Sequence, residues 1–297
     1  MRSSRCYRLP LVTATLALVG ALALSGCADS SASETLTVAG STTVLPIAEM
    51  AAEDFEANTG TNVLVSGLGS SAGIEAVSNG TADIATSSRQ LTAEESEHEL
   101  VETVIAHDGI AVIVSPENPV KGLTTEQLRD IYAGKIRNWS EVGGPDLAIQ
   151  VVNRDEASGT REAFRTIVMG DVSFDRTAAV LPGTGQVRDV VSRTPGAIGY
   201  ISIGFVDNDF ASTSVRSLTI DGVEATEENV EDGSYPISRD LYFFTNGDPQ
   251  GAAYDYISYV LSDAMNDTIR DAGYIPAHQT QGEGSEGTFV VVGVYRL

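Results

Sequence analysis

The feature that most constrains the fold of this chain is a repeated unit: a short apolar run, a loop of glycine, serine and threonine, and then a helical pattern. Short runs rich in valine, isoleucine and leucine are typical of buried strands, and apolar residues three or four positions apart are typical of helices. The unit recurs after the apolar runs 36–38, 62–65, 83–86 and 149–152. Strands that alternate with helices predict an α/β fold.

Local signals place further elements along the chain. Thr124 and Gln127 have the spacing of a capping box, which predicts the start of a short helix. After Pro249, apolar residues recur at helical spacing as far as Ile269, and this pattern predicts one continuous helix, the longest in the chain. The segment 289–295 has a strand-like composition but no evident place in the fold.

The N-terminus has the pattern of a secretory signal. Three arginines precede an apolar run at 9–24, and the sequence Leu-Ser-Gly-Cys27 follows. These four residues resemble the lipobox of bacterial lipoproteins, in which the cysteine is lipidated and becomes the new N-terminus. We therefore expect residues 1–26 to be removed, Cys27 to carry a lipid, and residues 27–34 to form a short tether. A plain secretory signal and an uncleaved membrane anchor are the alternatives.

Charge and cysteine content exclude several classes of function. The chain has 41 acidic and 18 basic residues and a formal net charge of −23, so its surface should repel nucleic acid. Its two cysteines are Cys6 in the signal and Cys27, which leaves the body of the chain without a thiolate for a disulfide or a metal. No spacing of histidine, cysteine or acidic residues matches a zinc or EF-hand pattern, and we expect no metal and no cofactor.

The loops between strands and helices have the composition of anion-binding loops. A helix N-terminus presents unpaired backbone N–H groups and a partial positive charge, while arginine adds a planar cation that fits oxyanions. One such loop alone is usually structural, because serine and threonine are the ordinary N-cap residues. Their co-occurrence indicates an α/β protein that binds an anion through residues of these loops: Ser41, Thr42, Ser70, Ser71, Ser87, Ser88, Arg89, Arg154, Ser158 and Thr160.

Eight segments resemble the phosphate-specific substrate-binding proteins of bacterial and archaeal phosphate ABC transporters, a periplasmic-binding-protein-like family. They span Thr35 to Pro276, and the element Arg154…Ser158-Gly159-Thr160 is the most specific of them. The matching segments are 39–43, 67–73, 83–89, 108–114, 134–139, 153–161, 196–200 and 235–239.

This resemblance implies a two-lobed α/β fold of type II, with a two-strand hinge and a ligand cleft between the lobes. Lobe 1 would comprise 35–114 plus 241–297, and lobe 2 would comprise 115–240. The connections near Ser115 and Asp240 would form the hinge, so that the lobes could close around a ligand.

The resemblance also implies the ligand-binding residues. One inorganic phosphate would be held by Ser41, Thr42, Ser70, Ser88, Arg89, Arg154, Ser158, Gly159 and Thr160. Some family members have an aspartate at the position of Ser88, where it accepts the proton of hydrogen phosphate. Here a hydroxyl, or another acceptor such as Asp155, would take that role, which opens the question of how phosphate is distinguished from sulfate.

The function implied is extracytoplasmic binding of inorganic phosphate and its delivery to the permease subunits of an ABC transporter. We expect a monomeric binding protein, anchored through lipid to the extracytoplasmic face of the cell membrane, and not an enzyme. Carriers of sulfate or molybdate, and a phosphate sensor, remain alternatives.

A serine hydrolase is the alternative from the enzymes. Residues 69–73 fit the pattern G-x-S-x-G, with Ser71 as the nucleophile on a strand-to-helix turn. Such an enzyme needs a histidine later in the chain. Of His98, His107 and His278, only His278 lies late enough, and no HGGG-type oxyanion loop is present.

Overall fold

The structure is a computed structural model, and it describes residues 35–206 and 214–277. The described residues belong to one compact unit. The expected tether, Cys27, His278 and the segment 289–295 lie outside the described residues. None of the helices formed by the described residues combines the length and the apolar character needed to cross a bilayer.

One mixed sheet organises the fold, in the strand order β2-β1-β3-β11-β4-β8-β6-β7. The pairs β1/β2, β1/β3, β6/β8 and β6/β7 are parallel, whereas β11 runs antiparallel to both β3 and β4, and β4 runs antiparallel to β8. The strands are β1 Thr35–Gly40, β2 Asn62–Gly67, β3 Ile84–Ser87, β4 Leu100–Val114, β6 Gln150–Arg154, β7 Ala179–Leu181, β8 Ala197–Ser202 and β11 Ser238–Asn246.

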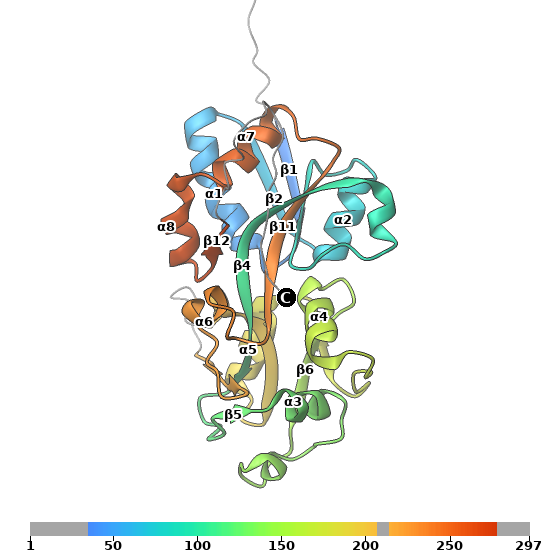
Figure 1. The fold of residues 1–297 in the computed structure, drawn as a ribbon, viewed down its shortest axis with the longest axis vertical. Helices are drawn as coiled ribbons and strands as arrows, with labels where there is room; N and C mark the ends of the chain where they lie inside the picture. The colour runs from blue at the N-terminus through green and yellow to red at the C-terminus, as the bar shows by residue number, and fades with distance from the viewer. Residues whose placement is uncertain (1–34, 207–213, 278–297) are drawn as a thin grey trace, which may run out of the picture. The chain divides into compact units, whose positions relative to one another are not determined.

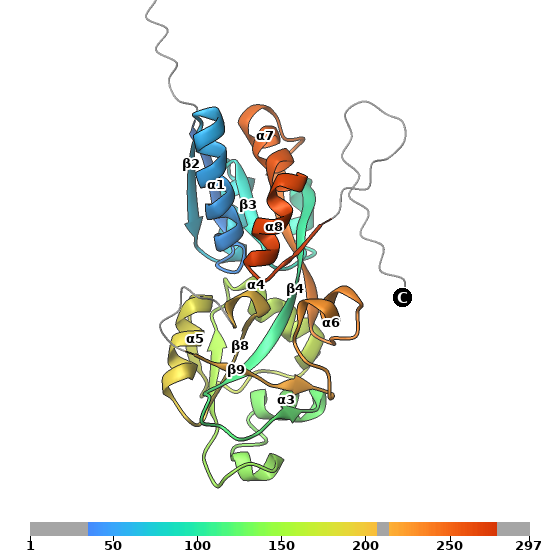
Figure 2. The same cartoon turned by 90° about the vertical axis from the view of Figure 1, so that its left-hand side faces the viewer.

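Short strands and helices complete the unit (Figures 1 and 2). Strands β9 Arg216–Ser217 and β12 Ile275–Pro276 pair with β4, and β5 Gly122–Leu123 pairs with β10 Thr219–Ile220. The helices are α1 Leu45–Thr59, α2 Ser70–Ser78, α3 Thr125–Tyr132, α4 Gly159–Phe164, α5 Thr184–Arg193, α6 Glu227–Glu231, α7 Gly251–Val260 and α8 Asp263–Asp271.

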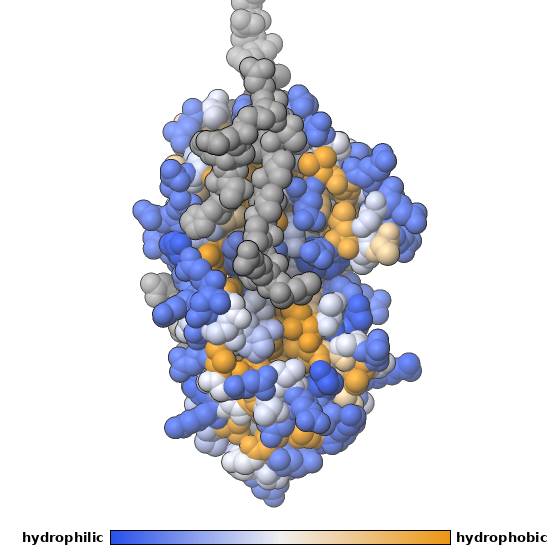
Figure 3. All heavy atoms as spheres, viewed as in Figure 1, coloured by the Kyte–Doolittle hydropathy of each residue, from blue (hydrophilic) through white to orange (hydrophobic). Residues whose placement is uncertain are grey.

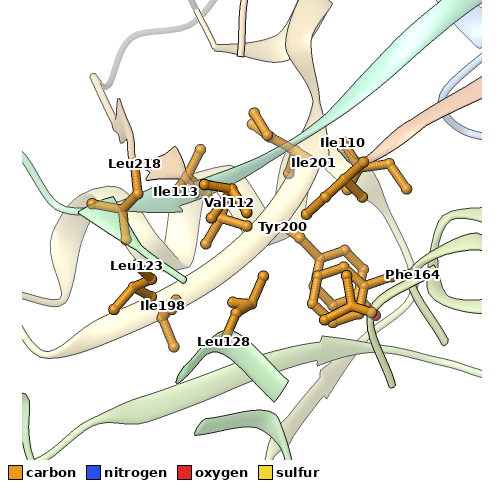
Figure 4. Close-up of a cluster of buried hydrophobic side chains, with 14 of the residues drawn as sticks. Ile110, Val112, Ile113, Leu123, Leu128, Phe164, Ile198, Tyr200, Ile201 and Leu218 are labelled. Carbon is orange, nitrogen blue, oxygen red and sulfur yellow. The ribbon is translucent and has the colours of Figure 1, made fainter. Parts of the chain in front are cut away.

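Two separate hydrophobic cores divide the described residues. One is built from β1, β3, α1, α7 and α8, and the other from β8, α3, α4 and α5. Figure 4 shows side chains of the second core, where the Phe164 and Tyr200 rings stack with centroids 4.2 Å apart. Strand β4 contributes to both cores: Ala106 belongs to the first and Ile110 to the second. The chain therefore passes from one core to the other within a single long strand.

The predicted α/β class is confirmed, and the capping box of Thr124 and Gln127 opens α3 as expected. The prediction of one long helix after Pro249 is wrong. Ser262 has an extended backbone (φ −80°, ψ 157°) and separates α7 from α8, while its hydroxyl donates to the Tyr259 carbonyl at 2.6 Å. Serine favours this role because it satisfies backbone groups left open at a helix end. Among the described residues, the longest helix is α1, with 15 residues.

Candidate functional site

The predicted ligand loops gather at the ends of strands from both halves of the sheet. Because β1, β2 and β3 are mutually parallel, the loops that follow them emerge at one edge of the sheet. The loop after β6 meets them there: the backbone N–H of Ser71 donates to the Ala157 carbonyl at 3.2 Å. The structure thus brings together residues that lie 86 positions apart in the sequence.

Ser70, Ser88 and Gly159 form the tightest part of this contact. The Ser88 N–H donates to the Ser70 Oγ at 3.1 Å, and the two hydroxyl oxygens are 3.5 Å apart. A Cβ atom built on Gly159 would lie 2.2 Å from the Ser70 Oγ and 2.7 Å from the Ser88 Oγ. Only a glycine at this position lets the α4 backbone approach the two serines so closely.

Hydroxyls of the loop after β1 also contact hydroxyls at the starts of α4 and α5. The Thr43 Oγ1 lies 3.0 Å from the Thr160 Oγ1, and the Thr42 Oγ1 lies 3.0 Å from the Thr184 Oγ1. Thr43, Thr160 and Thr184 are each about 1% exposed. Hydroxyls can donate or accept, so such pairs can turn their hydrogens toward a bound group.

Two predicted ligands have a structural role as well. The Ser158 Oγ accepts the Arg161 N–H at 3.2 Å and caps α4, and the Ser41 Oγ accepts the N–H groups of Thr43 and Val44 at 3.2 and 3.4 Å. Each oxygen is thereby oriented by backbone donors, which leaves its own hydrogen available to donate elsewhere.

Arg154 is a buried cation surrounded by neutral groups. Its guanidinium donates to the carbonyls of Leu181 and Pro182 at 3.2 and 2.7 Å, and to the hydroxyls of Thr184 and Thr42 at 3.2 Å each. The side chain is 1% exposed, and among the described residues it forms no ion pair. Burial lowers the pKa of Arg154 to about 10, with partial opposition from Tyr200 and Asp155.

Arg89 differs from Arg154 because its charge is already balanced. Its guanidinium forms a two-pronged ion pair with the Glu95 carboxylate at 2.6 and 2.7 Å and also donates to the Ser71 Oγ at 2.9 Å. Burial raises the pKa of the Glu95 carboxyl, but its hydrogen bonds with Arg89 and Thr92 outweigh this effect, so that the pKa is lowered. Arg89 follows Ser88 in the sequence and lines a cavity of about 430 Å³, which Arg239 and Tyr242 also line.

Ser71, the nucleophile of the hydrolase alternative, forms no hydrogen bond with a histidine among the described residues, and its Oγ accepts a hydrogen bond from the Arg89 guanidinium. Of the two histidines that the structure describes, the exposed His98 lies beside Glu99, and His107 pairs through Nδ1 with the Asp240 Oδ1 at 2.6 Å. Within the described ranges, no three histidine, cysteine or acidic side chains are arranged to hold a metal ion.

Sequence reasoning missed four residues that the structure adds to this cluster: Thr43, Asp108, Thr184 and Arg239. Thr43 stands next to two predicted ligands, and Arg239 ends the segment 235–239 that carries part of the family resemblance, so both had a signal. Asp108 begins the segment 108–114, which also carries part of the family resemblance, whereas Thr184 begins α5 and is not marked by its neighbours.

Comparisons with known proteins agree with this geometry. The sequence model described as the PBP superfamily domain matches residues 26–264. The phosphate-binding protein PstS of Bacillus subtilis is 35% identical over 254 residues, which are 84% of this chain and 82% of that protein. PstS of Borreliella burgdorferi is 32% identical over 261 residues, 85% of this chain and 93% of that protein.

Solved structures show the same similarity in three dimensions. A proposed phosphate ABC transporter substrate-binding protein from Clostridium perfringens, with bound phosphate, aligns with a TM-score of 0.78 at 38% identity, over 82% of this chain and 99% of that chain. An ABC-type phosphate transport receptor from Vibrio cholerae aligns with a TM-score of 0.68 at 36% identity, over 81% of this chain and 99% of that chain.

Proposed function

Since this chain belongs to the PBP superfamily, among the phosphate-binding proteins of ABC transporters, we propose that it binds inorganic phosphate outside the cytoplasm and delivers it to a transporter permease. The observation that carries this proposal is Arg154. The buried guanidinium is surrounded by carbonyls and hydroxyls and forms no ion pair among the described residues. The charge of Asp155 opposes the effect of burial only in part, and burying an incompletely balanced charge is costly. A bound phosphate oxygen would supply that charge and accept several of the hydrogens around it.

Phosphate would be held by the loops that meet at this point. The ligands are those that the resemblance implies, namely Ser41, Thr42, Ser70, Ser88, Arg89, Arg154, Ser158, Gly159 and Thr160. Of these, Ser70, Ser88 and Thr160 are each no more than about 1% exposed, so their hydrogen bonds to an anion would form away from bulk water. Arg89 would contribute less than Arg154 to the attraction of the anion, because Glu95 neutralises its charge.

Ligand capture would involve two lobes, 35–114 with 241–297 and 115–240. The two hydrophobic cores support a division into two lobes, but the core changes between Ala106 and Ile110 of β4, ahead of the boundary expected near Ser115. Strands β4 and β11 are the ones that would bend between the lobes. The contacts Thr43–Thr160 and Thr42–Thr184 join loops on the two sides, so they would separate when the lobes open.

Anchoring through a lipid on Cys27 is the proposed means of keeping the protein at the membrane, where the monomer would reach the permease. Only the sequence around Cys27 supports this part of the proposal. Mass spectrometry of the protein purified from membranes tests it: a diacylglyceryl group on an N-terminal Cys27 is the expected result, and an unmodified N-terminus would contradict it.

The protein would bind its ligand without chemical turnover. The hydroxyl of Ser71 accepts from Arg89, and a neighbouring cation is not the general base that a serine nucleophile needs. Incubation with phosphate esters and carboxylic esters should release no product, and turnover abolished by Ser71→Ala would instead establish the hydrolase.

Calorimetric titration of residues 27–297, stripped of ligand, tests the central proposal. Phosphate is expected to bind with one-to-one stoichiometry, and sulfate, added in a parallel titration, is expected to bind much more weakly. Equal binding of both anions would indicate a general oxyanion carrier. Absence of binding by either would refute the proposed function.

A further inference from the structure

A buried ion pair joins the two neighbouring strands β4 and β11. Asp108 of β4 and Arg239 of β11 are register partners, and the Asp108 Oδ2 accepts from the Arg239 Nη2 at 2.7 Å and from Nε at 3.0 Å. The other carboxylate oxygen accepts from the Ser202 hydroxyl at 2.6 Å. Asp108 is fully buried and Arg239 is 9% exposed, so the pair is held away from water by fixed partners.

The remaining donors of Arg239 point at the phosphate loops. Its Nη1 donates to the Ser88 carbonyl at 3.2 Å, and its Nη2 lies 3.4 Å from the Thr43 Oγ1. Both backbone groups of Ser88 are then engaged, because its N–H donates to Ser70. The Arg239 guanidinium thus connects β4 and β11 to two separate loops of the proposed site.

These contacts determine which of the Thr43 and Thr160 hydroxyls donates and which accepts. Arginine has donors and no acceptor, so Thr43 can only accept from Arg239 and must turn its own hydrogen elsewhere. The Thr160 Oγ1, 3.0 Å away, is the acceptor at hand, and Thr160 is then free to donate onward. Hydrogen bonds that share a hydroxyl in this way strengthen one another.

We propose that Arg239, fixed by Asp108, is a positioning residue of the phosphate site, which acts through Thr43 to make Thr160 a hydrogen-bond donor to the anion and holds the Ser88 backbone in place. This inference rests on the proposed function and adds a residue that would not touch the ligand. If the Asp108–Arg239 ion pair were purely structural, it would stabilise the pairing of β4 with β11 without changing the phosphate affinity of a correctly folded site.

Two sets of variants separate these roles. Arg239→Gln leaves Asp108 buried without its partner and should lower both the melting temperature and the phosphate affinity. The double variant Asp108→Asn/Arg239→Gln removes both charges, so the melting temperature should recover much of its loss, because a neutral pair avoids the unpaired buried charge. Its phosphate affinity should stay about tenfold or more below that of the wild type, since Thr43 and Ser88 are no longer fixed.

Thr43→Val and Thr43→Ser test the hydroxyl chain in a protein whose ion pair is intact. Valine keeps the volume and removes the hydroxyl, so we expect about a tenfold loss of phosphate affinity. Serine keeps the hydroxyl and should restore affinity to within about twofold of the wild type. Thr245→Val is the matched control, because it removes a buried hydroxyl of β11 that donates to the Gly247 carbonyl instead of contacting a phosphate loop.

The outcomes distinguish this inference from the proposed function. If the wild type binds no phosphate, the proposed function fails first. If the wild type binds phosphate and the double variant or Thr43→Val binds it equally well, the pair is only structural and the positioning role is refuted. Loss in both, with Thr43→Ser and Thr245→Val unchanged, is the result that supports it.

Discussion

Individual residues of the site differ most in how their charge is balanced. Arg89 pairs with Glu95 and Arg239 pairs with Asp108, whereas Arg154 contacts only neutral acceptors among the described residues. The two charges of a buried ion pair compensate each other, whereas a single buried cation favours the binding of an anion beside it. Arg154 is therefore the residue on which phosphate affinity should depend most strongly.

Arg154→Ala should weaken phosphate binding by about two orders of magnitude or more, since a hydrogen bond to a charged group contributes ~1.5–3 kcal/mol. Calorimetry on the ligand-stripped protein measures the change. Arg137→Ala is the control, because Arg137 is 64% exposed and forms only a surface ion pair with Asp175. Binding of Arg154→Ala at wild-type strength would refute its central role.

The lowered pKa of Arg154 predicts how binding depends on alkaline pH. A guanidinium that loses its proton above a pKa of about 10 can no longer balance phosphate. Affinity should thus hold between neutral pH and pH 9 and fall as the pH rises through about 10. Because bound phosphate stabilises the charged form, the fall should shift to higher pH at saturating phosphate. Titrations at several pH values, with circular dichroism to confirm folding, measure this.

Ser88 is the residue at which selectivity can be changed. A hydroxyl can accept the proton of hydrogen phosphate but can equally donate to sulfate, whereas a carboxylate only accepts when ionised. Ser88→Asp should therefore raise the ratio of phosphate to sulfate affinity, and Ser88→Asn, which lacks the charge, should not. Competition of each anion against labelled phosphate gives the ratio, and an unchanged ratio in Ser88→Asp would contradict this view of the site.

Elements set by local sequence were predicted well, and those set by distant contacts were not. The strand before each Gly/Ser/Thr loop and the capping box of α3 follow from neighbouring residues. The break at Ser262 was missed because apolar spacing continues across it. Likewise, Arg239 reaches Ser88 from 151 positions away, a contact that no local pattern encodes. The predicted phosphate ligands stay predictions until a variant or a complex tests them.

The first turn of α4 offers a test at the level of the element. Gly159→Ala places a methyl group against Ser70 and Ser88, so α4 must move away from them and phosphate affinity should drop by at least about tenfold. Gly185→Ala in α5 is the control, because nothing lies within 4 Å of its Cβ. Calorimetry and thermal unfolding would be measured for both, and normal affinity in Gly159→Ala would show that this close approach is dispensable.

The charge of the whole molecule opposes its proposed ligand. The net charge of the full sequence is −23, and removal of the expected signal with its three arginines would make it −26. Hydrophilic side chains cover much of the face seen in Figure 3. An anion that approaches from a distance is repelled, so affinity has to come from the buried donors around Arg154.

Salt therefore tests whether local donors or long-range attraction bring phosphate in. Ions screen exposed charges beyond about 8–10 Å at physiological strength, but they act much less on buried groups. Raising sodium chloride should leave the dissociation constant nearly unchanged and should increase the association rate, because the repulsion is screened while the buried contacts persist. Stopped-flow fluorescence gives the rate and calorimetry the affinity. A protein that instead attracted phosphate through surface charge would lose affinity steeply with salt, and that result would move the source of binding from the buried arginine to the surface.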